Sequence, residues 1–195
     1  MRLACLFSGG KDSTYALYLI LKQGHDVKYL VSVFPESLES YMFHYPMIEK
    51  TIDQAAAIGI EQIIVRTKGE KEKELEDLKK ALSKLDIDGV VSGAIASSYQ
   101  KSRIDKIAKE LGIASLAPLW HRDQESLLKE QIDAGFEMII THVAAEGLDR
   151  SWVGRRIDYK AFEELKKKAS IRVRNIKIRS FLGFISLLCC GQTFF

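Results

Sequence analysis

The segment Ser8-Gly9-Gly10-Lys11-Asp12-Ser13 combines two glycines, two hydroxyls, an ammonium and a carboxylate within six residues. These types suit an anion, since glycines let backbone N–H groups approach closely while hydroxyl and ammonium groups donate protons. The apolar run Leu3–Phe7 predicts a buried strand before it, and residues Ser13–Gln23 predict a helix that stops at Gly24. A strand, a glycine-rich turn and a helix N-terminus together predict a phosphate-binding loop, with an ordinary glycine-rich turn as the alternative.

The spacing of this motif excludes the P-loop of nucleoside triphosphatases. That pattern needs four residues between its first glycine and a Gly-Lys-Ser/Thr sequence. The motif instead resembles the PP-loop of the ATP pyrophosphatases. The resemblance implies that the loop binds the β,γ-diphosphate of ATP and releases it intact. Members of that group activate a carboxylate or carbonyl as an adenylate, and a nitrogen or sulfur nucleophile then displaces AMP.

Strand-like and helix-like segments alternate along the rest of the chain. Strands are predicted at 27–34, 63–65, 88–93, 114–116 and 136–143, and helices near 47–56, 75–85, 104–111 and 127–132. For the first of these helices, we predict an apolar face that includes Ile48, Ile52 and Ala55. This alternation predicts an α/β fold, a three-layer Rossmann-like domain with a mainly parallel sheet. The resemblance makes it adenine nucleotide alpha hydrolase-like. We place this nucleotide-binding domain at 1–145 and a C-terminal extension at 146–195.

Three loops are expected to meet at one ligand site. In open parallel sheets, ligands bind beyond the carboxyl ends of the strands where the strand order reverses. The loops after the first, second and fourth predicted strands contain residues 8–13, 32–45 and 93–99.

A second set of residues narrows the resemblance to the diphthine–ammonia ligase family, over residues 1 to about 165. The set comprises, in order, Met42-Phe43-His44, Gly93-Ala94-Ile95, Ser98-Tyr99-Gln100, Arg103, Leu111-Gly112-Ile113, Leu116-Ala117-Pro118-Leu119-Trp120, Asp123-Gln124, Gly147-Leu148-Asp149, Trp152 and Gly154-Arg155. The resemblance implies that ATP and ammonium convert the carboxylate of diphthine, a modified histidine on elongation factor 2, into an amide. The reaction would pass through an acyl adenylate and give AMP and diphosphate.

The resemblance also implies roles for single residues. The diphosphate would be cradled by Ser8, Gly9, Gly10 and Ser13, and Lys11 would offset its charge. Asp12 is the candidate ligand for Mg²⁺, directly or through water, with capping of the helix as an equal alternative. Arg103 would hold a phosphate or the substrate carboxylate, or form a surface ion pair. Further nucleotide contacts are assigned to Ser32, Val33, His44, Gly93, Ala94, Ile95 and Tyr99, and the substrate side to Trp120, His121, Asp123 and Gln124.

The charge of the chain is divided unevenly. The net charge is +3, yet no acidic residue follows Glu164, and residues 1–165 hold 22 basic against 26 acidic residues, a net charge of −4. A nucleic-acid footprint over the body of the protein is therefore not expected, although the basic end suits ribosomal RNA or elongation factor 2. The Glu-Gly-Gly-Glu-Tyr-Glu-Thr-like motif of the family is not found in this sequence. A shifted reading frame or a divergent paralogue would explain this departure.

Composition bounds the location and the competing functions. The sequence has no run of about 18 apolar residues, so we expect no membrane span. Three cysteines without zinc-like spacing predict a cytoplasmic protein. One alternative is a PP-loop enzyme that modifies transfer RNA; it is disfavoured because Cys5 is predicted to be buried and the body is acidic. Another is a non-catalytic module that binds adenine nucleotides.

Overall fold

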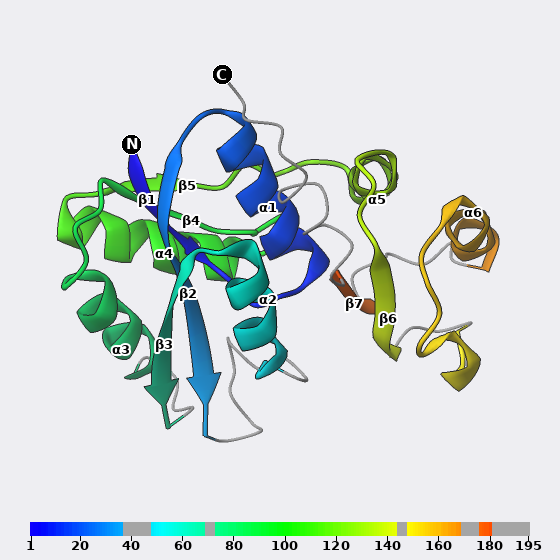
Figure 1. The fold of residues 1–195 in the computed structure, drawn as a ribbon, viewed down its shortest axis with the longest axis horizontal. Helices are drawn as coiled ribbons and strands as arrows, with labels where there is room; N and C mark the ends of the chain where they lie inside the picture. The colour runs from blue at the N-terminus through cyan, green and yellow to red at the C-terminus, as the bar shows by residue number, and fades with distance from the viewer. Residues whose placement is uncertain (37–47, 69–72, 144–147, 169–175, 181–195) are drawn as a thin grey trace. The chain divides into compact units, whose positions relative to one another are not determined.

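The computed structural model describes residues 1–36, 48–68, 73–143, 148–168 and 176–180 (Figure 1). The strands are β1 (Arg2–Leu6), β2 (Asp26–Pro35), β3 (Glu61–Thr67), β4 (Gly89–Val91), β5 (Ala114–Leu116), β6 (Met138–Val143) and β7 (Ile176–Ser180). The helices are α1 (Lys11–Lys22), α2 (Lys50–Ile58), α3 (Lys73–Leu82), α4 (Ser98–Leu111), α5 (Gln124–Asp133), α6 (Tyr159–Lys168) and the short 3₁₀ helix η1 (Arg150–Trp152). The chain divides into an N-terminal unit, Met1–His121, and a C-terminal unit, Arg122–Phe195.

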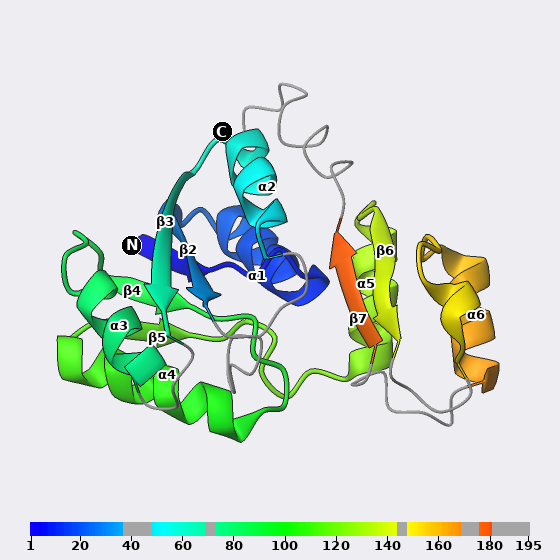
Figure 2. The same ribbon diagram turned by 90° about the horizontal axis from the view of Figure 1, so that it is seen from below.

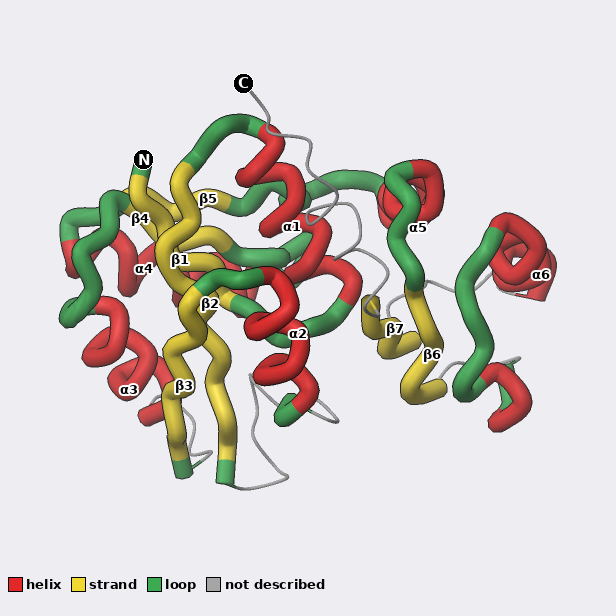
Figure 3. Tube along the Cα trace, in the orientation of Figure 1, coloured by secondary structure: helices red, strands yellow, loops and turns green. Residues whose placement is uncertain are grey.

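The sheet of the N-terminal unit is parallel throughout, with strand order β3-β2-β1-β4-β5. Figure 3 shows how helices alternate with these strands along the chain. The chain first builds outward from β1 through β2 to β3 and then crosses to β4 on the other side of β1. The strand order therefore reverses between β1 and β4, where parallel sheets bind ligands.

Helices cover both faces of this sheet, with α1 and α2 on one face and α3 and α4 on the other (Figure 2). Alternate strand residues point to opposite faces. Ala4, Val31 and Val90 therefore share one core with Leu78 of α3 and Ile104 of α4. This three-layer arrangement with a parallel sheet confirms the predicted fold class.

The face that α2 buries differs from the predicted one. Ile48 and Ala55 are buried as predicted, but Ile52 is 46% exposed, and α2 buries Thr51 in its place. The prediction followed hydrophobicity, whereas the inward position on this helix is taken by a threonine whose hydroxyl is hydrogen-bonded.

The C-terminal unit has a sheet of its own, in which β6 and β7 pair antiparallel. The other edge of β6 bonds to the segment after η1, where Ile140 N donates to Arg155 O at 3.0 Å and Ile157 N donates to Met138 O at 2.8 Å. The prediction placed this strand within a domain ending at 145. In the structure, β6 belongs to the unit that begins at Arg122, because it pairs with later segments rather than with the parallel sheet.

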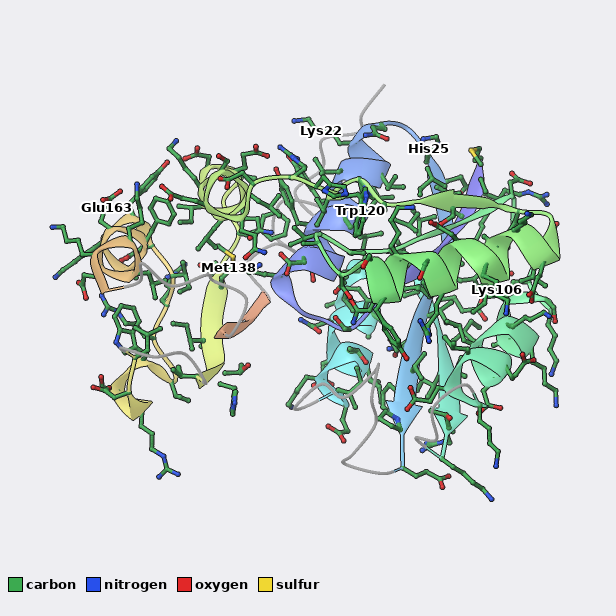
Figure 4. All side chains as sticks on the ribbon, turned by 180° about the vertical axis from the view of Figure 1, so that it is seen from behind. Lys22, His25, Lys106, Trp120, Met138 and Glu163 are labelled. Carbon is green, nitrogen blue, oxygen red and sulfur yellow. The ribbon has the colours of Figure 1, made fainter. Side chains whose placement is uncertain are left out.

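The core of the C-terminal unit comes from its two helices, its strand β6 and η1. Leu127 and Leu128 of α5, Phe162 of α6 and Trp152 are buried. Figure 4 labels Met138 on β6, also buried, and Glu163 on the exposed side of α6. Within the described ranges, the structure has no helix long and apolar enough to cross a bilayer.

Candidate functional site

The predicted phosphate loop lies at the carboxyl end of β1, beside the reversal of strand order. Phe7 N donates to Val31 O at 2.8 Å, which extends the pairing with β2 one residue beyond β1. The chain then turns through Gly9, whose φ of +68° lies in the left-handed region that favours glycine. A Cβ there would also lie 2.0 Å from Oε1 of Gln54. The backbone conformation therefore favours glycine at this position, and a side chain there would also displace the end of Gln54.

Helix α1 begins directly after the loop, with Gly10 as its N-cap residue and no side-chain cap. The first helical bond runs from Thr14 N to Gly10 O at 3.1 Å. The N–H groups of Lys11, Asp12 and Ser13 thus lie ahead of the helical hydrogen-bond ladder, as anion binding at a helix N-terminus requires.

The two serines of the motif meet across the turn. Ser8 Oγ and Ser13 Oγ lie 3.1 Å apart, and Ser8 N donates to Ser13 Oγ at 3.3 Å. Ser13 Oγ also bonds to Gly10 O at 3.1 Å. These bonds join the two ends of the six-residue motif, so the loop between β1 and α1 is closed.

Lys11 and Asp12 form an ion pair at the start of α1. The side chain of Lys11 is only 11% exposed and that of Asp12 is 32% exposed. Asp12 is the second residue of the helix, where its charge complements the helix dipole, while the cap position itself belongs to Gly10. No group of three or more metal-binding side chains occurs among the described residues. Asp12 offers one carboxylate at the loop, and even one suits Mg²⁺ because that ion keeps waters and phosphate oxygens as its other ligands.

The loop after β4 packs directly on the start of α1. A Cβ on Gly93 would lie 2.9 Å from Ser13 N and 3.0 Å from the carbonyl carbon of Asp12. The structure therefore brings the loops after the first and fourth predicted strands into contact. Ala94 is buried, and the carbonyl of Ile95 accepts a hydrogen bond from His121 N at 2.8 Å.

The segment after β5 is hydrogen-bonded to the loop after β4 through His121 N and Ile95 O. Its Trp120, labelled in Figure 4, contacts His121 edge to face with ring centroids 4.5 Å apart. His121 has a φ of +59°, a conformation uncommon outside glycine, and its side chain is exposed. The sequence assigns these two residues to the substrate side, and the structure places His121 next to Ile95 with Trp120 against the His121 ring.

Tyr99 and Arg103 lie one turn apart on α4. The guanidinium carbon of Arg103 sits 3.4 Å from the centroid of the Tyr99 ring, and Nη1 donates to Tyr99 O at 3.5 Å. Both residues are half-buried. Cation–π contact with its neighbour fixes the plane of the guanidinium before any anion is bound.

The predicted residues on β2 have buried side chains. Ser32 is fully buried, and its hydroxyl donates to Phe7 O at 2.6 Å. Val33 belongs to the core between the sheet and helices α3 and α4. A contact of their backbone groups with adenine stays a prediction. His44 lies outside the described residues, as does most of the loop after β2.

Comparison with known families assigns both parts of the chain. Residues 1–115 match the diphthamide synthase N-terminal domain, and residues 123–175 match the diphthamide synthase C-terminal domain. The chain belongs to the diphthamide synthase family. The interval between the two matches, 116–122, contains the division between the two structural units after His121.

Curated relatives carry the name diphthine–ammonia ligase. The human protein is 32% identical over 199 residues, covering 89% of this chain and 74% of the relative. The rat protein is 36% identical over 172 residues, covering 76% of this chain and 64% of the relative. The relative from Schizosaccharomyces pombe is 32% identical over 178 residues, and the match covers only 29% of its length. The chain thus spans part of each relative's length.

Sequence reasoning missed two polar residues next to this site. Ser92 ends the apolar run of β4 just before Gly93; it is only 6% exposed, and its Oγ has no hydrogen-bond partner among the described residues. Gln54 reaches from α2 to the loop, where its Nε2 donates to Gly9 O at 3.2 Å. A polar residue closing an apolar strand would have signalled Ser92. Gln54 lies on the same face of α2 as Thr51 and Ala55. It could have been found from the sequence only if that face had been predicted correctly.

Proposed function

We propose that this chain amidates diphthine on elongation factor 2, using ATP and ammonium and releasing AMP and diphosphate. Family membership and the names of the relatives support this reaction. The observation that carries the proposal is the junction at the sheet reversal, where Gly93 packs against the first turn of α1. That junction joins the phosphate loop to the loop proposed to line the nucleotide.

The chemistry explains why such a loop is needed. A carboxylate resists a nitrogen nucleophile because its carbon is weakly electrophilic and oxide is a poor leaving group. Attack of the carboxylate on the α-phosphate of ATP forms an acyl adenylate and releases diphosphate, and the nitrogen nucleophile then displaces AMP. The protein's part is to align the carboxylate and to bind and neutralise the departing diphosphate.

The described residues fit a triphosphate bound with Mg²⁺. Gly9 and Gly10 leave no side chain of their own over the loop, and the N–H groups of residues 11–13 precede the helical ladder. Lys11 places its ammonium group at the first turn of α1, and Asp12 would hold Mg²⁺ beside it. The buried hydroxyl of Ser92 would gain a hydrogen-bonding partner in the bound ligand. Arg103 would bind a phosphate or the substrate carboxylate.

Titration of ATP and AMP in the presence of Mg²⁺ tests the assignment of the loop. Lys11→Ala is expected to weaken ATP binding by about 10-fold or more, since a charge-assisted contact to phosphate is lost. AMP lacks the diphosphate, so its affinity is expected to stay within about 2-fold, a change well below that of one hydrogen bond. Equal losses for both nucleotides would remove Lys11 from the diphosphate site.

A second measurement separates the ligase from a non-catalytic nucleotide-binding module. The family match to the C-terminal domain ends at residue 175, before β7, and this departure is what favours the module. Diphosphate release is measured with ammonium, with and without elongation factor 2 bearing diphthine. Release that depends on the protein substrate supports the ligase, whereas ATP binding without such release supports the module.

Thiolation of transfer RNA through Cys5 is disfavoured by the structure. Cys5 is fully buried in β1, as predicted, and burial raises the pKa of its thiol to about 12. The thiol therefore stays protonated at neutral pH and is not a sulfur nucleophile.

A further inference from the structure

Helix α2 contacts the phosphate loop at Gly9. Nε2 of Gln54 donates to Gly9 O at 3.2 Å. The position of a Cβ on Gly9 is flanked by Gln54 Oε1 at 2.0 Å and by Cγ2 of Thr51 at 3.1 Å. One turn of α2 therefore sets where this peptide of the loop can lie.

A chain of hydrogen bonds ties the start of the same loop to β2, β3 and α2. Gln62 of β3 donates through Nε2 to Ser32 Oγ at 2.8 Å and to Thr51 Oγ1 at 2.8 Å. Ser32 Oγ then donates to Phe7 O at 2.6 Å, and Thr51 Oγ1 donates to Ile48 O at 2.7 Å. Ser32 and Thr51 are both fully buried, so these bonds are shielded from water.

The amide of Gln62 fixes the direction of this chain. Each of its two N–H bonds points at one hydroxyl, and an amide nitrogen can only donate. Each hydroxyl therefore donates its single proton to a carbonyl, which for Ser32 is that of Phe7. A side chain that only accepts at this position would draw the Ser32 proton away from Phe7 O.

Three carbonyls at this turn thus accept hydrogen bonds from the protein. Phe7 O accepts from Ser32, Gly9 O from Gln54, and Gly10 O from Thr14 N and from the hydroxyls of Ser13 and Thr14. A carbonyl oxygen that faces an anion repels it, while an N–H group attracts it. Fixing these oxygens on protein donors keeps them from turning toward a phosphate.

We propose that Gln54 and Gln62 are positioning residues for the diphosphate, acting through the carbonyls of Gly9 and Phe7. Neither side chain is itself assigned a contact with the nucleotide. The proposal rests on the proposed function, because it takes the loop to be the site of the diphosphate of ATP.

Two isosteric pairs of variants test it. Gln62→Glu and Gln54→Glu replace a donor with an acceptor, and Gln62→Met and Gln54→Met remove the donor without adding charge. Glu61→Gln on β3 and Asp53→Asn on α2 are matched controls, because both carboxylates belong to exposed neighbours on the same elements. ATP and AMP affinities are measured by calorimetric titration with Mg²⁺, together with the thermal midpoint of each variant.

The methionine variants are expected to weaken ATP binding about 5- to 10-fold, the factor for one lost hydrogen bond, with AMP affinity within 2-fold of wild type. The glutamate variants are expected to lose more, and the controls to match wild type. A purely structural role would lower the thermal midpoint and weaken both nucleotides alike, and that result overturns the proposal. Unchanged ATP affinity in folded Gln54→Met also overturns it, even where the Gln62 variants fail to fold.

The wild-type control separates this inference from the function beneath it. A wild-type chain that binds ATP through Lys11, combined with Gln variants that behave as wild type, removes the positioning role alone. A wild-type chain that binds neither nucleotide removes the proposed function, and the positioning role falls with it.

Discussion

At the scale of single residues, the ammonium of Lys11 already pairs with the carboxylate of the next residue. An anion entering the loop must compete with Asp12 for that charge unless a cation engages the carboxylate. Mg²⁺ bound to the phosphates would remove this competition. The pair therefore couples the two roles assigned to Lys11 and Asp12.

Substitution of Asp12 by asparagine separates its two candidate roles. If Asp12 holds Mg²⁺, Asp12→Asn is expected to raise the affinity for ATP without metal and to lower the gain in affinity that Mg²⁺ brings. The measurement is the ratio of ATP dissociation constants with Mg²⁺ and with a chelator. If Asp12 only complements the helix dipole, that ratio stays unchanged while stability falls by about 0.3–1 kcal/mol.

The buried hydroxyl of Ser92 leads to a prediction with opposite effects on binding and stability. Ser92→Ala removes no hydrogen bond made within the described residues, so the thermal midpoint of the protein alone is expected to hold or rise. ATP binding is expected to weaken by about 5-fold, since a bond to the ligand is lost. Thermal unfolding with and without ATP measures both quantities. A fall in the midpoint without ATP would contradict the role given to this hydroxyl.

At the scale of elements, the starts of β1 and β4 are joined by a charged contact. Arg2 donates to Asp88 from its backbone N and from Nη2, each at 2.8 Å, and also pairs with Asp86. The side-chain hydrogen bond from Arg2, followed by its backbone bond, lowers the pKa of Asp88 from 3.8 to about 2. This contact holds β4 in register beside the strand that leads into the phosphate loop.

Acid is expected to weaken this contact. Because folding lowers the pKa of Asp88, its stabilisation is complete above about pH 4 and is lost as the pH falls toward 2. Asp88→Asn should lower the thermal midpoint at pH 6, and the difference from wild type should shrink between pH 4 and 2. Asp86→Asn is the matched control, because its carboxylate is 80% exposed and a smaller change is expected. A difference that stays constant over this pH range would contradict the assignment.

The elements of the N-terminal unit were predictable because each strand and helix carries its own local pattern. The contacts that complete the site were not predictable in this way. Hydrophobicity pointed Ile52 inward, whereas the structure turns Thr51 and Gln54 inward, where Thr51 donates to Ile48 O and Gln54 donates to Gly9 O of the loop. Sequence patterns report burial of apolar surface, and they carry little signal for a buried polar side chain whose partner lies on another element.

At the scale of the whole molecule, the boundary between the units depends on strand pairing rather than on composition. The predicted strand at 136–143 exists as β6, yet its partner β7 and the segment at 154–157 lie later in the chain. The sequence of one apolar strand does not show whether its partner strand runs parallel or antiparallel to it. The division after His121 therefore emerged only from the structure and from the family matches.

Separate cores predict separate responses to a core substitution. Trp152 is 2% exposed and stacks on the guanidinium of Arg155, 4.2 Å from the ring centroid. Trp152→Ala is expected to cost about 3–5 kcal/mol, as for other large-to-small core changes. Hydrogen exchange followed by mass spectrometry should show faster exchange in α5, β6 and α6, with β1 and β4 still protected. An equal loss of protection in both units would mean that they unfold as one.

The pairing of β1 with β4 also sets the order in which the phosphate site can appear during translation. A nascent chain that has left the ribosome only through α2 exposes all six motif residues, but Gly93, which packs on Asp12 and Ser13, has not yet emerged. At about 5–20 residues per second, roughly 4 to 17 seconds pass before β4 follows β1 out of the ribosome. Under the proposed function, nucleotide capture by the growing polypeptide therefore waits until β4 has emerged and paired with β1.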